Sequence, residues 1–140
     1  MSHKSKNSII EGCGFHHVTV QTRDWEESLR LYQDVLGMEL VAEFGSPERK
    51  VVLLDIGDGN HIELFAPTGD TPSVGAPAIS DPIVHFALAT TDTVAALEHI
   101  RQAGYEITMG PKVISMGDSQ AIIGFLEGPN GEAIEFFQID

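Results

Sequence analysis

The sequence contains one diverged internal repeat, which constrains the fold more than any other feature. Three segments recur in the same order: 15–20 matches 83–88, 36–40 matches 103–107, and 58–65 matches 130–137. The offsets are 68, 67 and 72 residues, so order and spacing are both kept. We therefore interpret the chain as two copies of one structural module. Two unrelated α+β halves are the alternative interpretation.

Each copy is predicted to form a strand, a helix and three further strands. In the first copy, the apolar periodicity predicts a helix over 25–36 and strands near 15–21, 38–44, 50–56 and 61–66. In the second copy, the same patterns predict a helix over 93–103 and strands near 83–89, 106–109, 119–126 and 132–138. Asp24 and Asp92 are the expected N-caps of the helices, and Gly37 and Gly104 are their expected stops. The predicted fold class is α+β, with two βαβββ modules.

A segment rich in proline separates the two copies. Residues 67–82 hold four of the seven prolines and two glycines, a composition that is typical of a linker. The expected organisation is a tail over 1–12, a first module over 13–66, a linker over 67–82 and a second module over 83–140.

Strand alternation predicts which side chains share a face. Successive side chains of a strand point to opposite faces, and one face of each strand at the repeated positions is aliphatic. The opposite faces present two histidines and two glutamates, one from each repeated position: His17, Glu63, His85 and Glu135. Imidazole and carboxylate groups suit a divalent transition metal. Each of these residues alone is more often a surface group than a ligand, so the hypothesis of a metal site depends on the repeat.

The composition excludes several classes of function. The 140 residues include 8 basic and 21 acidic side chains, for a net charge of −13. An acidic surface repels phosphate backbones and anionic lipids, so neither nucleic acid nor a membrane surface is an expected partner. No apolar run approaches the roughly 20 residues of a membrane span. Cys13 is the one cysteine, which excludes an internal disulfide. We expect a soluble, cytoplasmic protein that acts on a small molecule.

Several motifs point to a known family. The first predicted helix ends in a Tyr-x-x-x-Leu-Gly pattern from Tyr32 to Gly37, and Pro129-Asn130-Gly131 forms a hairpin turn before the last strand. With the segments 17–20, 62–65, 85–87 and 125–135, these motifs make the chain similar to the vicinal oxygen chelate superfamily from Phe15 to Gln138. This superfamily includes glyoxalase I, methylmalonyl-CoA epimerase, extradiol dioxygenases, and fosfomycin and bleomycin resistance proteins. The resemblance implies that the two modules form a U-shaped mixed sheet around one metal, in a homodimer.

The resemblance also implies a site and a reaction. Glyoxalase I uses His, Glu, His and Glu as ligands, and the four positions of this chain match that set in residue type: His17, Glu63, His85 and Glu135. The implied cofactor is one divalent ion per site, of nickel, cobalt, zinc, manganese or iron. The implied activity is that of a glyoxalase-like lyase or isomerase. It would act on a small α-oxo or α-hydroxy carbonyl compound, free or as a thiol adduct, by metal-stabilised enediolate proton transfer. Glu135 is the first candidate for the catalytic base, and Glu63 is a candidate to share that role.

Two positions depart from the enzymes that use glutathione. Those enzymes carry an arginine four residues after the first histidine and an asparagine four residues after the first glutamate, where this chain has Gln21 and Pro67. Two alternatives therefore stay open. One is another enzyme of the superfamily: an epimerase, an extradiol dioxygenase or a fosfomycin-type transferase. The other is a protein that binds a drug or metabolite without turnover.

Overall fold

The structure is a computed structural model that describes residues 5–6, 8–9, 15–74, 85–116 and 119–139. It divides into two compact units, Met1–Ser73 and Val74–Asp140. Most of the expected tail lies outside the described residues, and so do Cys13 and residues 75–82 of the expected linker. Within the described residues, no helix has both the length and the apolar character needed to cross a membrane.

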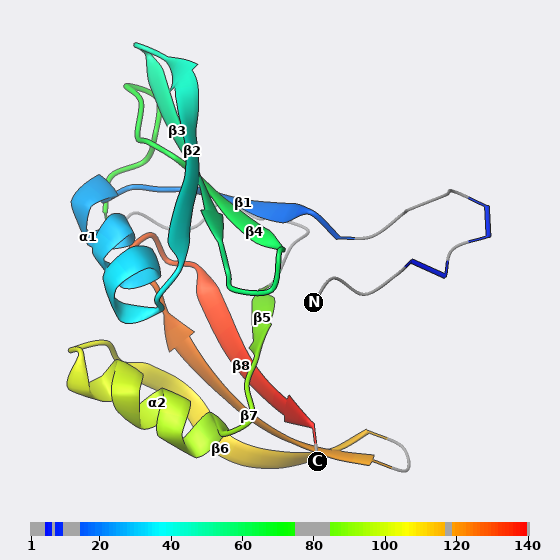
Figure 1. Cartoon of the computed structure of the whole chain (residues 1–140). Coiled ribbons are helices and arrows are strands. Elements are labelled where there is room, and N and C mark those ends of the chain that lie inside the picture. Colours follow the sequence, from blue (N-terminus) through cyan, green and yellow to red (C-terminus); the bar gives the residue numbers. More distant parts are fainter. Residues whose placement is uncertain (1–4, 7, 10–14, 75–84, 117–118, 140) are drawn as a thin grey trace. The chain divides into compact units, whose positions relative to one another are not determined.

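The first unit is a four-stranded mixed sheet with one helical segment (Figure 1). Its elements are β1 (His17–Gln21), α1 (Trp25–Leu29), η1 (Arg30–Val35), β2 (Glu39–Ser46), β3 (Arg49–Asp55) and β4 (His61–Phe65). The strand order is β1-β4-β3-β2. Strands β1 and β4 are parallel, and the other two pairs are antiparallel.

The second unit has the same topology. Its elements are β5 (Phe86–Ala89), α2 (Thr93–Gln102), β6 (Ile107–Met116), β7 (Ser119–Glu127) and β8 (Ala133–Ile139). The strand order is β5-β8-β7-β6, with β5 parallel to β8 and the other pairs antiparallel. The predicted α+β class and the two βαβββ modules are confirmed, and the alternative of two unrelated halves is wrong.

The predicted helix starts are confirmed by their hydrogen bonds. The Asp24 carboxylate accepts from the Glu27 N–H at 3.1 Å, and the Asp92 carboxylate accepts from the Ala95 N–H at 3.0 Å. Gly37 and Gly104 follow the helical segments with φ of 75° and 97°. This left-handed conformation ends a helix at low cost only for glycine.

The first helix differs from the prediction in its second half. Residues Arg30–Val35 form a π-helical turn, in which the Leu36 N–H donates to the Leu31 carbonyl at 2.8 Å. A π turn adds one residue to a turn of an otherwise α-helical segment. Apolar spacing over 25–36 cannot distinguish one such turn from a regular helix of the same length.

Strand β6 is longer than the predicted strand over 106–109. It runs to Met116 through Gly110-Pro111, which directly follow the predicted strand. The pairing with β7 shifts between Met109 and Lys112, so this dipeptide sits in an irregularity of the ladder. Because β6 is an edge strand, proline removes no hydrogen bond that a further neighbouring strand would need.

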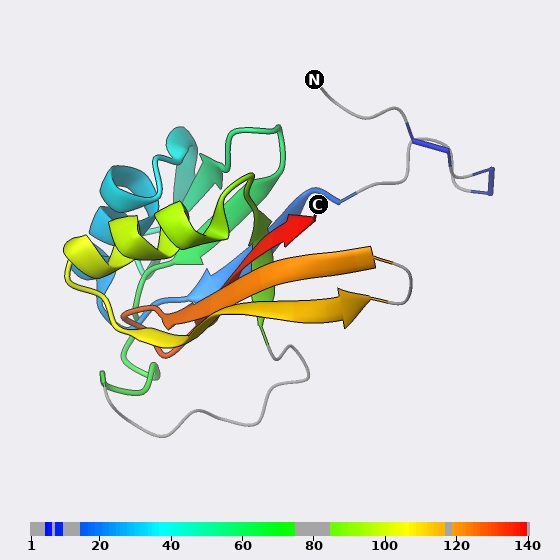
Figure 2. The same cartoon turned by 90° about the horizontal axis from the view of Figure 1, so that it is seen from below.

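The core of each unit comes from alternate strand positions and from the helical segment. In β4, Ile62 and Leu64 are buried, whereas their neighbours are partly exposed. In the second unit, α2 lies along one face of the sheet (Figure 2), and its Leu97 and Ile100 are buried. In β4, the alternation places His61 and Glu63 on the face opposite Ile62 and Leu64.

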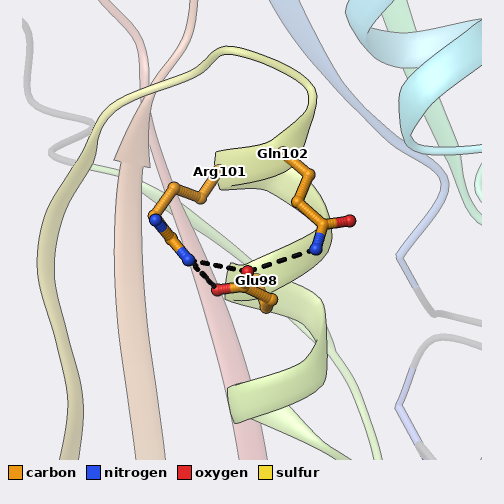
Figure 3. Close-up of polar contacts among 3 residues, drawn as sticks. All are labelled: Glu98, Arg101 and Gln102. Atoms are coloured by element: carbon orange, nitrogen blue, oxygen red, sulfur yellow. Dashed lines mark hydrogen bonds and ion pairs between the residues drawn. The ribbon is translucent and has the colours of Figure 1, made fainter.

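The exposed side of α2 is stabilised by a local ion pair (Figure 3). The Arg101 guanidinium donates to Glu98 from Nε at 3.0 Å and from Nη2 at 2.6 Å, and the Gln102 amide donates to the same carboxylate at 3.2 Å. These hydrogen bonds lower the pKa of the Glu98 carboxyl, with the bond from Arg101 as the largest cause. Arg101 in the last turn also interacts favourably with the helix dipole.

Gly124 of β7 allows close packing of α2 on the sheet. A Cβ atom at this position would overlap the side chain of Leu97 on α2. We expect Gly124→Ala to lower the free energy of unfolding by about 1–3 kcal/mol, because overpacking shifts the helix or strains Leu97. Chemical denaturation measures the change. Gly69→Ala is the matched control, since a Cβ there meets nothing within 4 Å. Equal stabilities for the two variants would contradict the expectation.

Candidate functional site

The first module brings His17 and Glu63 together. His17 is the first residue of β1, Glu63 lies in the middle of β4, and these strands are parallel neighbours. The Nε2 atom of His17 lies 3.8 Å from Oε1 of Glu63, and the two side chains are 37% and 14% exposed. The imidazole therefore has an edge open to solvent, while the carboxylate is mostly covered.

The second module brings His85 and Glu135 together in the same way. The sequence predicts His85 inside a strand over 83–89. In the structure, β5 begins at Phe86, so His85 is the residue directly before the strand. Glu135 is the third residue of β8, the parallel neighbour of β5. The Nε2 atom of His85 lies 3.3 Å from Oε1 of Glu135, and the side chains are 37% and 8% exposed.

The electrostatics of both pairs suit a bound cation. In the part of the chain that the structure describes, neither Glu63 nor Glu135 forms an ion pair with lysine or arginine, and each carboxylate faces a histidine instead. A mostly buried carboxylate is costly without a positive partner. An imidazole nitrogen and a carboxylate oxygen are also donors that transition metals accept. The residues present therefore fit a divalent ion.

His61 does not enlarge the first pair into a triad. It shares a sheet face with Glu63, but its Nδ1 lies 3.2 Å from the His16 carbonyl and its ring lies 4.7 Å from the His16 ring. Across the described ranges, no group of three or more histidine, cysteine, aspartate or glutamate side chains is placed to hold a metal. Each module thus contributes two candidate ligands.

Three neighbours of these pairs were not predicted as site residues. Thr19 donates a hydrogen bond from its hydroxyl to Oε1 of Glu63 at 3.0 Å. The Nδ1 atoms of His16 and His17 lie 2.9 Å apart. Phe125 of β7 meets the His85 ring edge-on, with ring centres 5.1 Å apart. Strand alternation could have found Thr19, which stands two residues after His17 on the same face, whereas Phe125 is found only from the pairing of β7 with β8.

Gln21 is held by the backbone at the end of β4. Its amide nitrogen donates to the carbonyls of Thr22, Phe65 and Ala66 at 3.0, 3.4 and 3.3 Å. The side chain is therefore a neutral group turned toward carbonyl oxygens. It does not supply the charge that an arginine would offer to a substrate carboxylate at this place on the sheet.

Comparisons with known proteins identify a family for the chain. The family model of the glyoxalase/bleomycin resistance protein/dioxygenase superfamily matches residues 14–136. A lactoylglutathione lyase of Haemophilus influenzae is 32% identical over 127 residues, which cover 87% of this chain and 90% of that protein.

Solved structures show the same fold. A V278E variant of glyoxalase I from Zea mays matches with a TM-score of 0.74 and 23% identity, over 89% of this chain and 44% of that longer chain. An antibiotic-binding protein, TnmS3 from Streptomyces sp. CB03234, matches with a TM-score of 0.68 and 17% identity, over 96% of this chain and all of that one. The fold is therefore shared by proteins described as enzymes and by a protein described as binding an antibiotic.

Proposed function

The chain belongs to the glyoxalase/bleomycin resistance protein/dioxygenase superfamily, and on this basis we propose that it is a metal-dependent lyase or isomerase. Its substrate would be a small α-oxo or α-hydroxy carbonyl compound, free or as a thiol adduct. The observation that carries this proposal is the repeated pair of histidine and glutamate, in which each covered carboxylate faces an imidazole rather than a lysine or arginine.

In this proposal, one divalent ion would be held by the four residues that the family resemblance implies as ligands: His17, Glu63, His85 and Glu135. Two neutral imidazoles and two carboxylates would leave a doubly charged ion close to neutral. Such an ion, when bound, would supply Lewis-acid chemistry that makes a proton on the carbon beside a substrate carbonyl more acidic.

The proton is moved by a carboxylate of the chain. Glu135 is the proposed base, because its side chain is 8% exposed and so largely shielded from water that would compete for the proton. It would accept the proton from one carbon and return it to the neighbouring carbon. Glu63 would remain a ligand during the transfer.

A comparison of two thiol adducts tests which substrate class the protein accepts. The Haemophilus influenzae relative is named a lactoylglutathione lyase, but Gln21 offers no positive charge to a glutathione carboxylate. We propose an α-oxo thiol adduct as the first substrate class to test, with methylglyoxal adducts of glutathione and of an uncharged thiol compared side by side. The ratio of kcat/KM for the two adducts reports how far an anionic thiol is recognised.

The experiment that tests the function follows hydrogen exchange at the carbon beside the carbonyl in deuterated water. Protein loaded in turn with nickel, cobalt, zinc, manganese or iron is incubated with each adduct. We expect exchange that requires both the metal and the substrate carbonyl. A protein that binds metal but exchanges no proton across a broad set of α-oxo compounds would instead be a metabolite-binding protein.

We also propose a homodimer. Strand β2 is an edge strand that exposes three large apolar side chains, Leu40, Val41 and Phe44, each about half accessible. An exposed apolar edge is usually covered by another element or another chain. We expect light scattering at micromolar concentration to give about twice the mass of the chain. A monomeric mass would contradict this prediction without affecting the choice of metal ligands.

A further inference from the structure

The two histidine–glutamate pairs are equivalent in topology but differ in what surrounds the carboxylate. From this difference we propose that Thr19 is a positioning residue that holds Glu63 as a permanent metal ligand and thereby assigns proton transfer to Glu135. The inference rests on the proposed function, because it concerns how the chain presents its two carboxylates to the ion.

The strand pairing places matched neighbours beside each carboxylate. Glu63 lies between Thr19 on β1 and Leu53 on β3. Glu135 lies between Ala87 on β5 and Phe125 on β7. Each carboxylate thus has one apolar neighbour on its antiparallel side. The difference lies on the parallel side, where a threonine in the first module corresponds to an alanine in the second.

This difference between threonine and alanine decides whether the carboxylate accepts a hydrogen bond from the neighbouring strand. The Thr19 hydroxyl donates to Oε1 of Glu63 at 3.0 Å, the same oxygen that faces Nε2 of His17. The methyl group of Ala87 has no proton to donate. Among the described residues, the polar partner of the Glu135 carboxylate is His85.

The two imidazoles also differ in their neighbours. Nδ1 of His17 lies 2.9 Å from Nδ1 of His16, so a proton on the His17 nitrogen can be donated there and Nε2 is left with its lone pair for a metal. The ring of His85 instead packs against the edge of Phe125, with the two planes at 85°. The first pair is therefore oriented by polar partners and the second by apolar ones.

These contacts suggest different roles for the two carboxylates, one as a fixed ligand and one as the base. A carboxylate that accepts a hydrogen bond from a neighbouring side chain is held in one geometry, and moving it costs that bond as well as any metal contact. A general base must be able to turn toward the carbon-bound proton. Glu63 meets the first description. Glu135, which has Ala87 in place of a hydroxyl donor, is left for the second.

The first test compares Thr19→Val with Thr19→Ser. Valine keeps the shape of threonine without the hydroxyl, and serine restores the hydroxyl without the methyl group. We expect the Kd for Zn²⁺, measured by competition with a chromophoric chelator, to rise about 10–100-fold in Thr19→Val and to stay within about 3-fold of the parent in Thr19→Ser. Thermal unfolding of the metal-free proteins serves as the control for an intact fold.

The outcomes separate this inference from the proposed function. If the parent binds Zn²⁺ and Thr19→Val binds it equally well, the role of Thr19 is wrong while the metal site stands. If both Thr19 variants lose affinity alike, the hydroxyl is not the cause and the inference is again wrong. If the parent binds no divalent ion, both the inference and the proposed function fail.

The second test transfers the hydroxyl to the other module with Ala87→Thr. The same register would place the new hydroxyl beside Glu135 as Thr19 lies beside Glu63. We expect kcat for proton exchange to fall about 10–100-fold without a loss of Zn²⁺ affinity, because the base would be held as a ligand. Unchanged exchange in Ala87→Thr would contradict the assignment of the two carboxylates.

Discussion

Glu135→Gln is expected to reduce proton exchange at the substrate carbon by about 10²–10⁴-fold, the usual contribution of a general acid or base. The amide keeps the size of the side chain and an oxygen that can still face the ion, but it cannot accept a proton. The loss should therefore appear in kcat rather than in KM, since in the proposed site the ion and not this carboxylate would bind the substrate. Exchange in deuterated water, followed by nuclear magnetic resonance, measures the step directly.

Glu63→Gln is the matched comparison, because it makes the same chemical change at the equivalent position of the other module. We expect this variant to lose metal affinity rather than the proton-transfer step, since Glu63 is the carboxylate that accepts the hydrogen bond from Thr19. Exchange in Glu135→Gln that is as fast as in the parent would show that Glu135 is not the base. Exchange that is lost only in Glu63→Gln, with metal added to saturation, would reverse the two roles.

His85→Ala is expected to raise the Kd for a divalent ion by about 100-fold or more, because a lost ligand costs more than the 10–100-fold effect of an outer hydrogen bond. His17→Ala should act in the same direction, since the two residues occupy equivalent positions in the two modules. Metal content after exhaustive dialysis, measured by plasma mass spectrometry, reports the change. The parent should retain about one ion per set of four ligands.

His99→Ala provides the control for the histidine variants. His99 is exposed on α2, in the last turn of the helix, and belongs to neither pair. We expect its removal to leave metal content unchanged. Metal content that is equal to the parent in both His17→Ala and His85→Ala would reject the ligand assignment, whatever the activity of the protein.

The module repeat could be derived from the sequence because its signals are local. Aspartate before each helix and glycine after it mark the helix ends within a few residues of chain. Alternation assigns a strand residue to a face through its immediate neighbours, and the burial of β4 follows that alternation. The same rule assigns His17 and Glu63 to the face away from the aliphatic core without any information on strand pairing.

Two local features could not be predicted from the apolar pattern. The π turn at Arg30–Val35 keeps the apolar spacing of a helix, so the pattern does not reveal it. Strand β6 continues past Gly110-Pro111 because an edge strand tolerates a residue without an N–H. Neither the turn type nor the edge position is encoded in the period of the apolar residues.

The two modules and the four candidate ligands can be predicted from the sequence, since they depend on local patterns that recur in the same order and spacing in both halves of the chain. The neighbours of each carboxylate, in contrast, depend on strand pairing that no local pattern reveals. Thr19 meets Glu63 across 44 residues of chain, and Phe125 meets His85 across 40. Such contacts depend on which strands pair and in which register, and a shift of one residue would turn every side chain to the other face. The difference between the two carboxylates is therefore a property of the fold, although it arises from one threonine and one alanine.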